Sequence, residues 1–246
     1  MYSESEEVIM NNDFIWGRIK EDAKIAFHNQ WGVAVLITLF IGFFTLVNEA
    51  LSAVENIAIN TSLYKELLDS EVIDAIIKFY MKYDILFLVV PLAISLFLII
   101  AKYGECKLYL DIVESRDARF STIFEGFLYV FKAVGASLYT TILIVLWSFL
   151  FFIPGLIAGI KYSMTTYIIA ENPSIPITDA VDMSKNMMDG HKMDYFMLKL
   201  SFIPWVILIT LTCGLASIYV TPYMNSATAQ FYVQVKSEYE VENGEE

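Results

Sequence analysis

The chain has 246 residues, of which 57% are hydrophobic and only 18% are charged, and its formal net charge is −12. This acidity argues against a nucleic-acid-binding protein, because such proteins present a basic face to their ligand. The hydrophobic share is high for a soluble domain of this length and indicates a membrane protein.

Residues 1–30 are predicted to form a cytoplasmic tail and an amphipathic helix. In residues 14–30, Ile19, Ala23 and Phe27 share one helical face, and most of the charged side chains lie on the other. A helix of this kind typically lies in the lipid headgroup region with its apolar face toward the acyl chains. We therefore expect it to lead directly into the first membrane span.

Four stretches with almost no charge set the number of predicted spans. Residues 29–48, 85–101 and 200–235 contain no Asp, Glu, Lys, Arg or His, and residues 133–170 contain only Lys161. Because roughly 20 helical residues cross a bilayer, the two shorter stretches fit one span each, and the two longer ones must each fold back as a hairpin. The sequence therefore predicts an all-α polytopic membrane protein. Its six transmembrane helices would occupy residues 31–235, with spans near 31–51, 85–102, 133–153, 156–171, 195–212 and 215–234.

The segments between the spans carry their own signals. Apolar residues recur at helical spacing in 62–81 and 178–189, which predicts two further amphipathic interfacial helices. Thr122 and Glu125 have the spacing of a capping box, which predicts a helix leading into the third span. Residues 236–246 are predicted to be an acidic cytoplasmic tail.

The distribution of basic residues predicts the orientation. If the N-terminus is inside, the outer segments contain only Lys65, Lys78 and Lys82, and most other lysines and arginines lie in inner segments. Cytoplasmic segments are enriched in these residues, so we expect both termini to be cytoplasmic.

Several short pieces of the C-terminal half match a known family. They are Ile153-Pro154-Gly155, Tyr162-Ser163-Met164, Asn172-Pro173, Leu200-Ser201-Phe202, Pro222-Tyr223 and Phe231-Tyr232. The sequence resembles the uncharacterised bacterial integral-membrane family with domain of unknown function 975. The resemblance implies a multi-pass protein of the bacterial plasma membrane with six helices. It supplies no activity, substrate or catalytic residue.

Lys161 is the candidate intramembrane charge. A charge inside the bilayer is costly and often marks a pathway or a ligand, although a lysine can also extend its stem to the interface. Glu49 is its candidate partner, because it would lie near the outer end of the first span. Gly155, Gly159 and Ser163 share one face of the fourth span, where small residues allow close helix packing, within the chain or in a dimer.

No enzyme motif is present. The chain has no His-Glu-x-x-His sequence and no glycine-rich phosphate loop, and the spacing of Asp179, Asp182 and His191 matches no familiar metal-ligand set. We therefore expect no enzyme activity, no cofactor, no metal and no nucleic-acid partner.

Two kinds of function remain open. The first is a non-enzymatic protein that acts by binding, as a subunit, scaffold or protective factor of the cell envelope. Its partners would be the lipid bilayer and a further membrane protein. The alternative is a small transporter or lipid-handling protein with a polar cavity around Lys161 and the sixth span. A closed bundle favours the first, and a continuous polar cavity favours the second.

Overall fold

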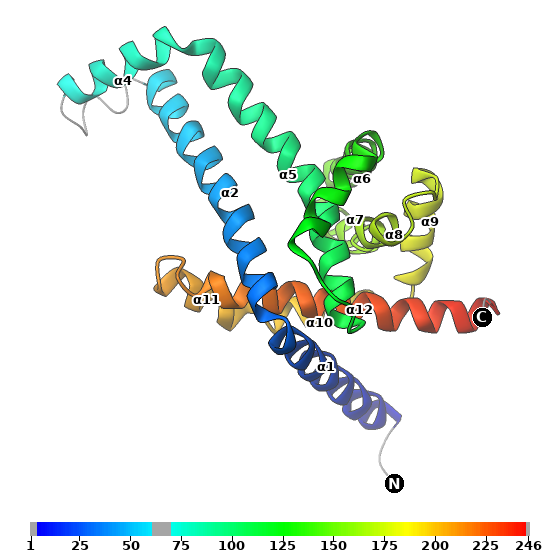
Figure 1. Ribbon diagram of the computed structural model, residues 1–246. Helices are drawn as coiled ribbons and strands as arrows, with labels where there is room; N and C mark the ends of the chain where they lie inside the picture. Colours follow the sequence, from blue (N-terminus) through cyan, green and yellow to red (C-terminus); the bar gives the residue numbers. More distant parts are fainter. Residues whose placement is uncertain (1–3, 61–69, 245–246) are drawn as a thin grey trace. The chain divides into compact units, whose positions relative to one another are not determined.

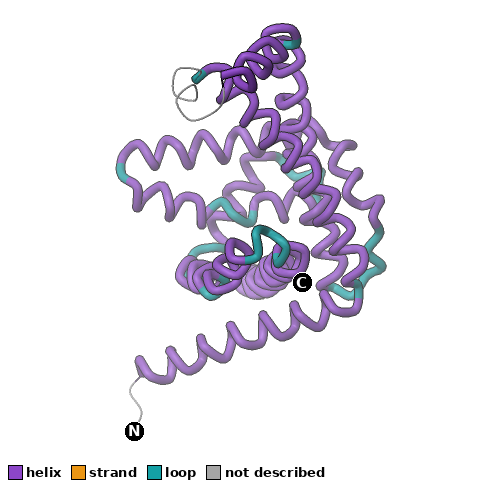
Figure 2. Tube along the Cα trace, turned by 90° about the vertical axis from the view of Figure 1, so that its left-hand side faces the viewer, coloured by secondary structure: helices purple, strands orange, loops and turns teal. Residues whose placement is uncertain are grey.

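The computed structural model describes residues 4–60 and 70–244, and within these ranges the chain is helical with no strand (Figure 1). Short turns and loops connect the helices (Figure 2). The predicted all-α class is therefore confirmed. The chain forms two compact units, Met1–Thr38 with Ile100–Glu246, and Leu39–Ile99.

The helices are, in chain order, α1 (Glu4–Asn29), α2 (Trp31–Ile59), α4 (Ser70–Lys82), α5 (Asp84–Val113), the 3₁₀ helix η1 (Phe120–Tyr129), α6 (Val130–Leu150), α7 (Phe152–Lys161), α8 (Thr165–Glu171), α9 (Ile177–Met187), α10 (Lys192–Leu200), α11 (Ile203–Leu211) and α12 (Ser217–Asn243). Helices α2 and α5 each contribute residues to both units.

Four helical segments in the described part of the chain are long and apolar enough to cross a membrane. They are Trp31–Ile57, Asp84–Val113, Phe120–Phe149 and Lys192–Leu211. They coincide with the first, second, third and fifth predicted spans. The predicted fourth span is divided, because α7 ends at Lys161 and α8 begins at Thr165. The predicted sixth span, 215–234, lies in α12 except for its first two residues, and the hydroxyl and amide side chains of α12 lower its hydropathy.

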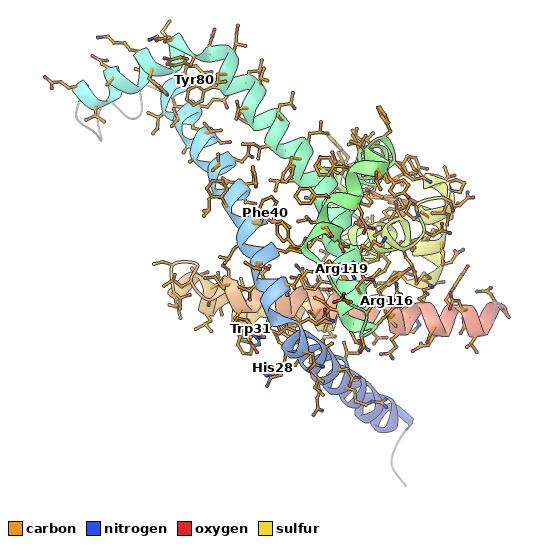
Figure 3. All side chains as sticks on the ribbon, viewed as in Figure 1. His28, Trp31, Phe40, Tyr80, Arg116 and Arg119 are labelled. Carbon is orange, nitrogen blue, oxygen red and sulfur yellow. The ribbon has the colours of Figure 1, made fainter. Side chains whose placement is uncertain are left out.

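Helix α1 packs against protein on its apolar face, which the sequence predicts to point toward the acyl chains of the bilayer. Ile19, Ala23 and Phe27 are buried, and the Phe27 ring meets the Tyr219 ring of α12 edge to face at 5.4 Å. Lys20 lies on the same side, with its ammonium 4.8 Å from the centre of the Phe202 ring, and burial lowers its pKa. Figure 3 marks the junction that follows, with His28 near the end of α1 and Trp31 at the start of α2.

A close backbone approach in the first unit joins α5 to η1. A Cβ added at Gly104 would overlap the backbone of Ile123, and one added at Gly126 would overlap the carbonyl oxygen of Ile100. Only glycine allows this contact. The capping-box prediction is wrong here, since residues 120–129 form a 3₁₀ helix whose N-cap is Arg119, without a side-chain cap.

The second unit is held together by aromatic contacts. Phe97 of α5 lies 4.7 Å from Phe44 and 6.0 Å from Phe40 of α2, between ring centres. The Phe87 ring packs against the rings of Phe79 and Tyr80 of α4, with 5.8 and 5.3 Å between ring centres. Phe40 and Tyr80 are labelled in Figure 3. Helix α4 covers the C-terminal part of the helix predicted at 62–81, and residues 61–69 lie outside the described residues.

Candidate functional site

A buried carboxylate lies at the centre of the first unit. Glu105 lies on α5 and is only 5% exposed. It accepts a hydrogen bond from Lys102 Nζ at 2.8 Å and another from Asn225 Nδ2 of α12 at 2.8 Å. A buried carboxylate is costly unless it is paired and hydrogen-bonded, and these two donors supply that compensation.

A second lysine meets the same face of α12. Lys199, on α10, donates from Nζ to Thr228 Oγ1 at 2.8 Å, and its ammonium lies 5.1 Å from the centre of the Tyr195 ring. Thr228 follows Asn225 by three positions, so the two side chains are neighbours on the helix surface. We call Lys102, Glu105, Lys199, Asn225 and Thr228 the polar cluster. It connects α5, α10 and α12.

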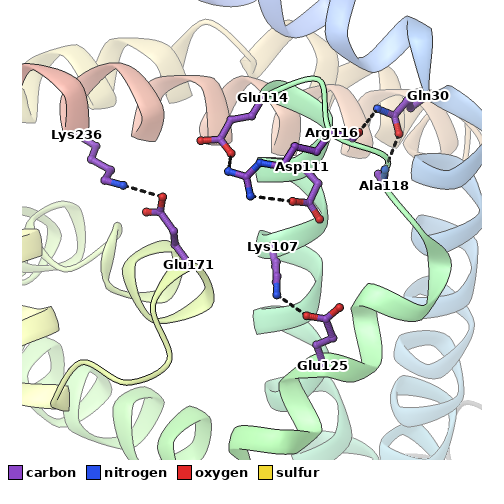
Figure 4. A network of polar contacts seen from close by, with 9 residues as sticks. All are labelled: Gln30, Lys107, Asp111, Glu114, Arg116, Ala118, Glu125, Glu171 and Lys236. Atoms are coloured by element: carbon purple, nitrogen blue, oxygen red, sulfur yellow. Dashed lines mark hydrogen bonds and ion pairs between the residues drawn. The ribbon is translucent and has the colours of Figure 1, made fainter. Parts of the chain in front are cut away.

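A separate network fixes the loop between α5 and η1 (Figure 4). The Gln30 side chain donates from Nε2 to the carbonyl oxygen of Arg116 at 2.7 Å and accepts from the Ala118 amide at 2.9 Å. Arg116 in turn pairs with Asp111 and with Glu114. One amide side chain therefore satisfies two backbone groups of a loop far away in the sequence.

Glu171 joins the end of α8 to the C-terminal half of α12. It accepts hydrogen bonds from Tyr232 Oη and Lys236 Nζ, each at 2.7 Å (the Lys236 bond is drawn in Figure 4). Partial burial opposes the charge of Lys236, but the hydrogen bond and the charge of Glu171, with Glu240 nearby, raise its pKa overall. This pair fixes α12 on the edge of the first unit.

Lys161 is the last residue of α7, and its backbone carbonyl accepts a hydrogen bond from Ser184 Oγ of α9 at 2.9 Å. Its side chain lines a pocket with Trp147, Pro154, Ile157 and Ala158. Glu49 belongs to the second unit, on α2. The proposed pairing of these two charges stays a prediction.

The three small residues of the predicted packing face differ from one another. Gly155 lies against α6, where an added Cβ would stand 2.9 Å from Ser148 Cα. An added Cβ at Gly159 would meet no atom within 4 Å. Ser163 donates to the carbonyl of Ile160 at 2.8 Å, within its own turn. All three line one groove together with Ser148 and Tyr195, so the close approach is confined to Gly155.

Sequence reasoning missed the polar cluster. Glu105 follows the predicted end of the second span at 102, and Lys199 lies near the start of the fifth, so neither is singled out by an uncharged run. The one local signal is the spacing of Lys102 and Glu105, which are three apart and therefore adjacent on a helix. The residues that the structure describes contain no group of three or more His, Cys, Asp or Glu side chains that could hold a metal.

A family model described as "Protein of unknown function (DUF975)" matches residues 74–239, which is more than half of the chain. The chain belongs to this family. The DUF975 match confirms the resemblance drawn from the sequence and includes all five residues of the polar cluster. Comparisons with curated proteins and with solved structures give no match.

Proposed function

We propose that this DUF975 protein is a non-enzymatic, multi-pass integral membrane protein of the bacterial plasma membrane that acts by binding, as a subunit, scaffold or protective factor of the cell envelope. Both termini would be cytoplasmic. Its apolar helices and the uncharacterised family are compatible with this function.

The observation that carries the proposal is how α12 uses its polar side chains. Asn225 and Thr228 belong to the most polar of the predicted spans, and both bond inward, to Glu105 and Lys199. In a transporter we would expect such groups to line a cavity and await a solute. Here each of them bonds to a residue of another helix, which holds the helices together, as polar residues do in membrane bundles.

Helix α4 supplies the contact surface. Of the two amphipathic interfacial helices predicted at 62–81 and 178–189, the second corresponds to α9, whose apolar residues Ala180, Val181 and Met187 are buried in the first unit. Helix α4 instead leaves Val72 53% exposed and Phe79 54% exposed, outside the four candidate spans. The two residues are seven positions apart and therefore lie on one face of the helix. Exposed apolar side chains gathered on one short helix are typical of a protein interaction site.

Affinity purification with a matched pair of variants tests this function. The tagged full chain is extracted in mild detergent, and the proteins that cross-link to α4 and co-elute are identified. Val72→Asp should abolish recovery of the partner and leave the melting temperature unchanged. Val241→Asp, at a residue 76% exposed near the end of α12, is the control and should retain it. If no protein cross-links to α4, or if both variants retain the same partner, the proposal is wrong.

A small transporter or lipid-handling protein is the second candidate function. Two pockets on α7 favour it, one containing Lys161 and the other containing Gly159, Ser163 and Tyr195. If this function holds, Lys161→Met should abolish movement of lipid or solute in proteoliposomes. Partner recovery should be unaffected by that substitution if the chain is a scaffold.

A further inference from the structure

The polar cluster contains more positive than negative charge. Lys102 and Lys199 contribute two ammonium groups and Glu105 contributes one carboxylate, which leaves one excess positive charge. The carboxylate pairs with Lys102, whereas Lys199 bonds to the neutral hydroxyl of Thr228. Among the residues that the structure describes, no carboxylate lies within ion-pair distance of Lys199.

Hydrogen bonds link the two ammonium groups through one face of α12. Lys102 bonds to Glu105 and Glu105 to Asn225, which lies one helical turn from Thr228, the partner of Lys199. Lys199 is half-buried, and a charge removed from water without an opposite partner is strongly unfavourable. An anion beside both lysines would remove the excess charge.

Hydrogen-bond donors remain for such an anion. A lysine ammonium has three N–H groups, and here Lys102 uses one on Glu105 and Lys199 uses one on Thr228. The Thr228 hydroxyl donates to the Met224 carbonyl at 2.8 Å, so its own proton is already engaged. The ligand would therefore be bound by the two ammonium groups.

The location of Lys102 indicates which anion can reach the cluster. It is the first charged residue after the apolar run 85–101, which is about the length of one bilayer crossing. Lys102 therefore stands where the uncharged part of α5 ends, and its side chain is 52% exposed, so a lipid headgroup can approach it.

We propose that Lys102 and Lys199 together bind one phosphate group that carries a single negative charge. A phosphodiester matches the excess charge of the cluster, and its oxygens accept charge-assisted hydrogen bonds from both lysines. Its source is the headgroup of an anionic lipid or a free phosphate ion. The site is separate from α4 and does not depend on the proposed partner.

Ligand binding by the delipidated full chain in neutral detergent tests the site. Phosphatidylglycerol, zwitterionic phosphatidylcholine and inorganic phosphate are titrated separately, with bound lipid counted by native mass spectrometry and stability followed by thermal melting. Lys199→Met and Lys102→Met should each weaken binding by about tenfold or more, as expected for a lost charge-assisted bond. Lys199→Arg should retain binding. Lys185→Met removes an exposed lysine of α9 and is the charge-matched control.

The arms distinguish the two sources. A lipid site gives phosphatidylglycerol binding that exceeds phosphatidylcholine binding and is lost in both methionine variants. A free-phosphate site gives stabilisation by inorganic phosphate that is lost in the same variants, with no preference between the lipids. The proposal is overturned if no ligand binds the wild-type chain, or if the variants at Lys102 and Lys199 bind as tightly as Lys185→Met.

Discussion

Replacing Gly104 with alanine should destabilise the first unit, because the new methyl group has no room. An added Cβ would lie 2.5 Å from both the carbonyl carbon and the Cα of Ile123, and would overlap its oxygen. These are backbone atoms, so no rotamer change can relieve the contact, and η1 must move away from α5. Overpacking typically costs about 1–3 kcal/mol, and we expect the upper end here. The gain of about 1 kcal/mol for alanine over glycine in a helix offsets part of this cost.

The net loss is therefore about 2 kcal/mol, which for a chain of this size corresponds to a fall in melting temperature of about 4–8 °C. Thermal melting in one detergent compares Gly104→Ala with Gly159→Ala, whose methyl would meet no atom within 4 Å. The control should melt at or above the wild-type temperature. Gly126→Ala should resemble Gly104→Ala, and the double variant should lose less than the sum, because both glycines serve one contact. Equal melting of Gly104→Ala and Gly159→Ala would refute this reasoning.

Three further predictions concern polar groups. The Ser226 hydroxyl is buried and has no hydrogen-bond partner among the described residues, so Ser226→Ala should leave the free energy of unfolding unchanged or raise it by up to about 1 kcal/mol. A clearly lower free energy of unfolding in chemical denaturation would contradict this prediction. The pKa of Lys236 is raised in the folded state, so its stabilising effect is complete below its unfolded pKa and is lost as the pH rises through the folded value. The melting temperature should therefore fall as the pH rises above about 10.5, and this fall should be smaller in Glu171→Gln. An equal fall in the variant would contradict the pairing. Gln30→Glu keeps an acceptor for the Ala118 amide but removes the donor to the Arg116 carbonyl. It should therefore lower the free energy of unfolding by less than Gln30→Ala, for which we expect a loss of about 1–3 kcal/mol in chemical denaturation. Equal losses for the two variants would argue against hydrogen bonding by both ends of the amide.

The sequence predicts helices well where one physical property dominates. Long uncharged runs give α2, α5 and α6, because apolar length alone determines them. The uncharged run 200–235 is interrupted at Cys213-Gly214, where both residues have positive φ. Proline does not by itself mark helix boundaries here: α5 continues through Pro91 and α12 through Pro222, whereas Pro204 lies in the first turn of α11.

Local patterns do not reveal contacts between distant segments. The break between α7 and α8 falls at residues 162–164, which include neither glycine nor proline. Glu105 and Asn225 are 120 positions apart, so no spacing rule connects them. Gly104 and Gly126 look unremarkable in the sequence, since their role arises only when α5 meets η1. The Gly155, Gly159 and Ser163 pattern shows the converse, because an attractive motif gives only one close contact.

The contact between α1 and α12 has a consequence for how the protein is made. The first helix leaves the ribosome early, and the ring that covers Phe27 belongs to Tyr219, near the other end of the chain. At synthesis rates of about 5–20 residues per second, that gap lasts on the order of ten seconds or more. During this interval Ile19, Ala23 and Phe27 form an uncovered apolar stripe, which headgroups or an insertion chaperone can shelter. A nascent chain stalled before α12 should keep this stripe accessible to proteases, marking incomplete copies for removal.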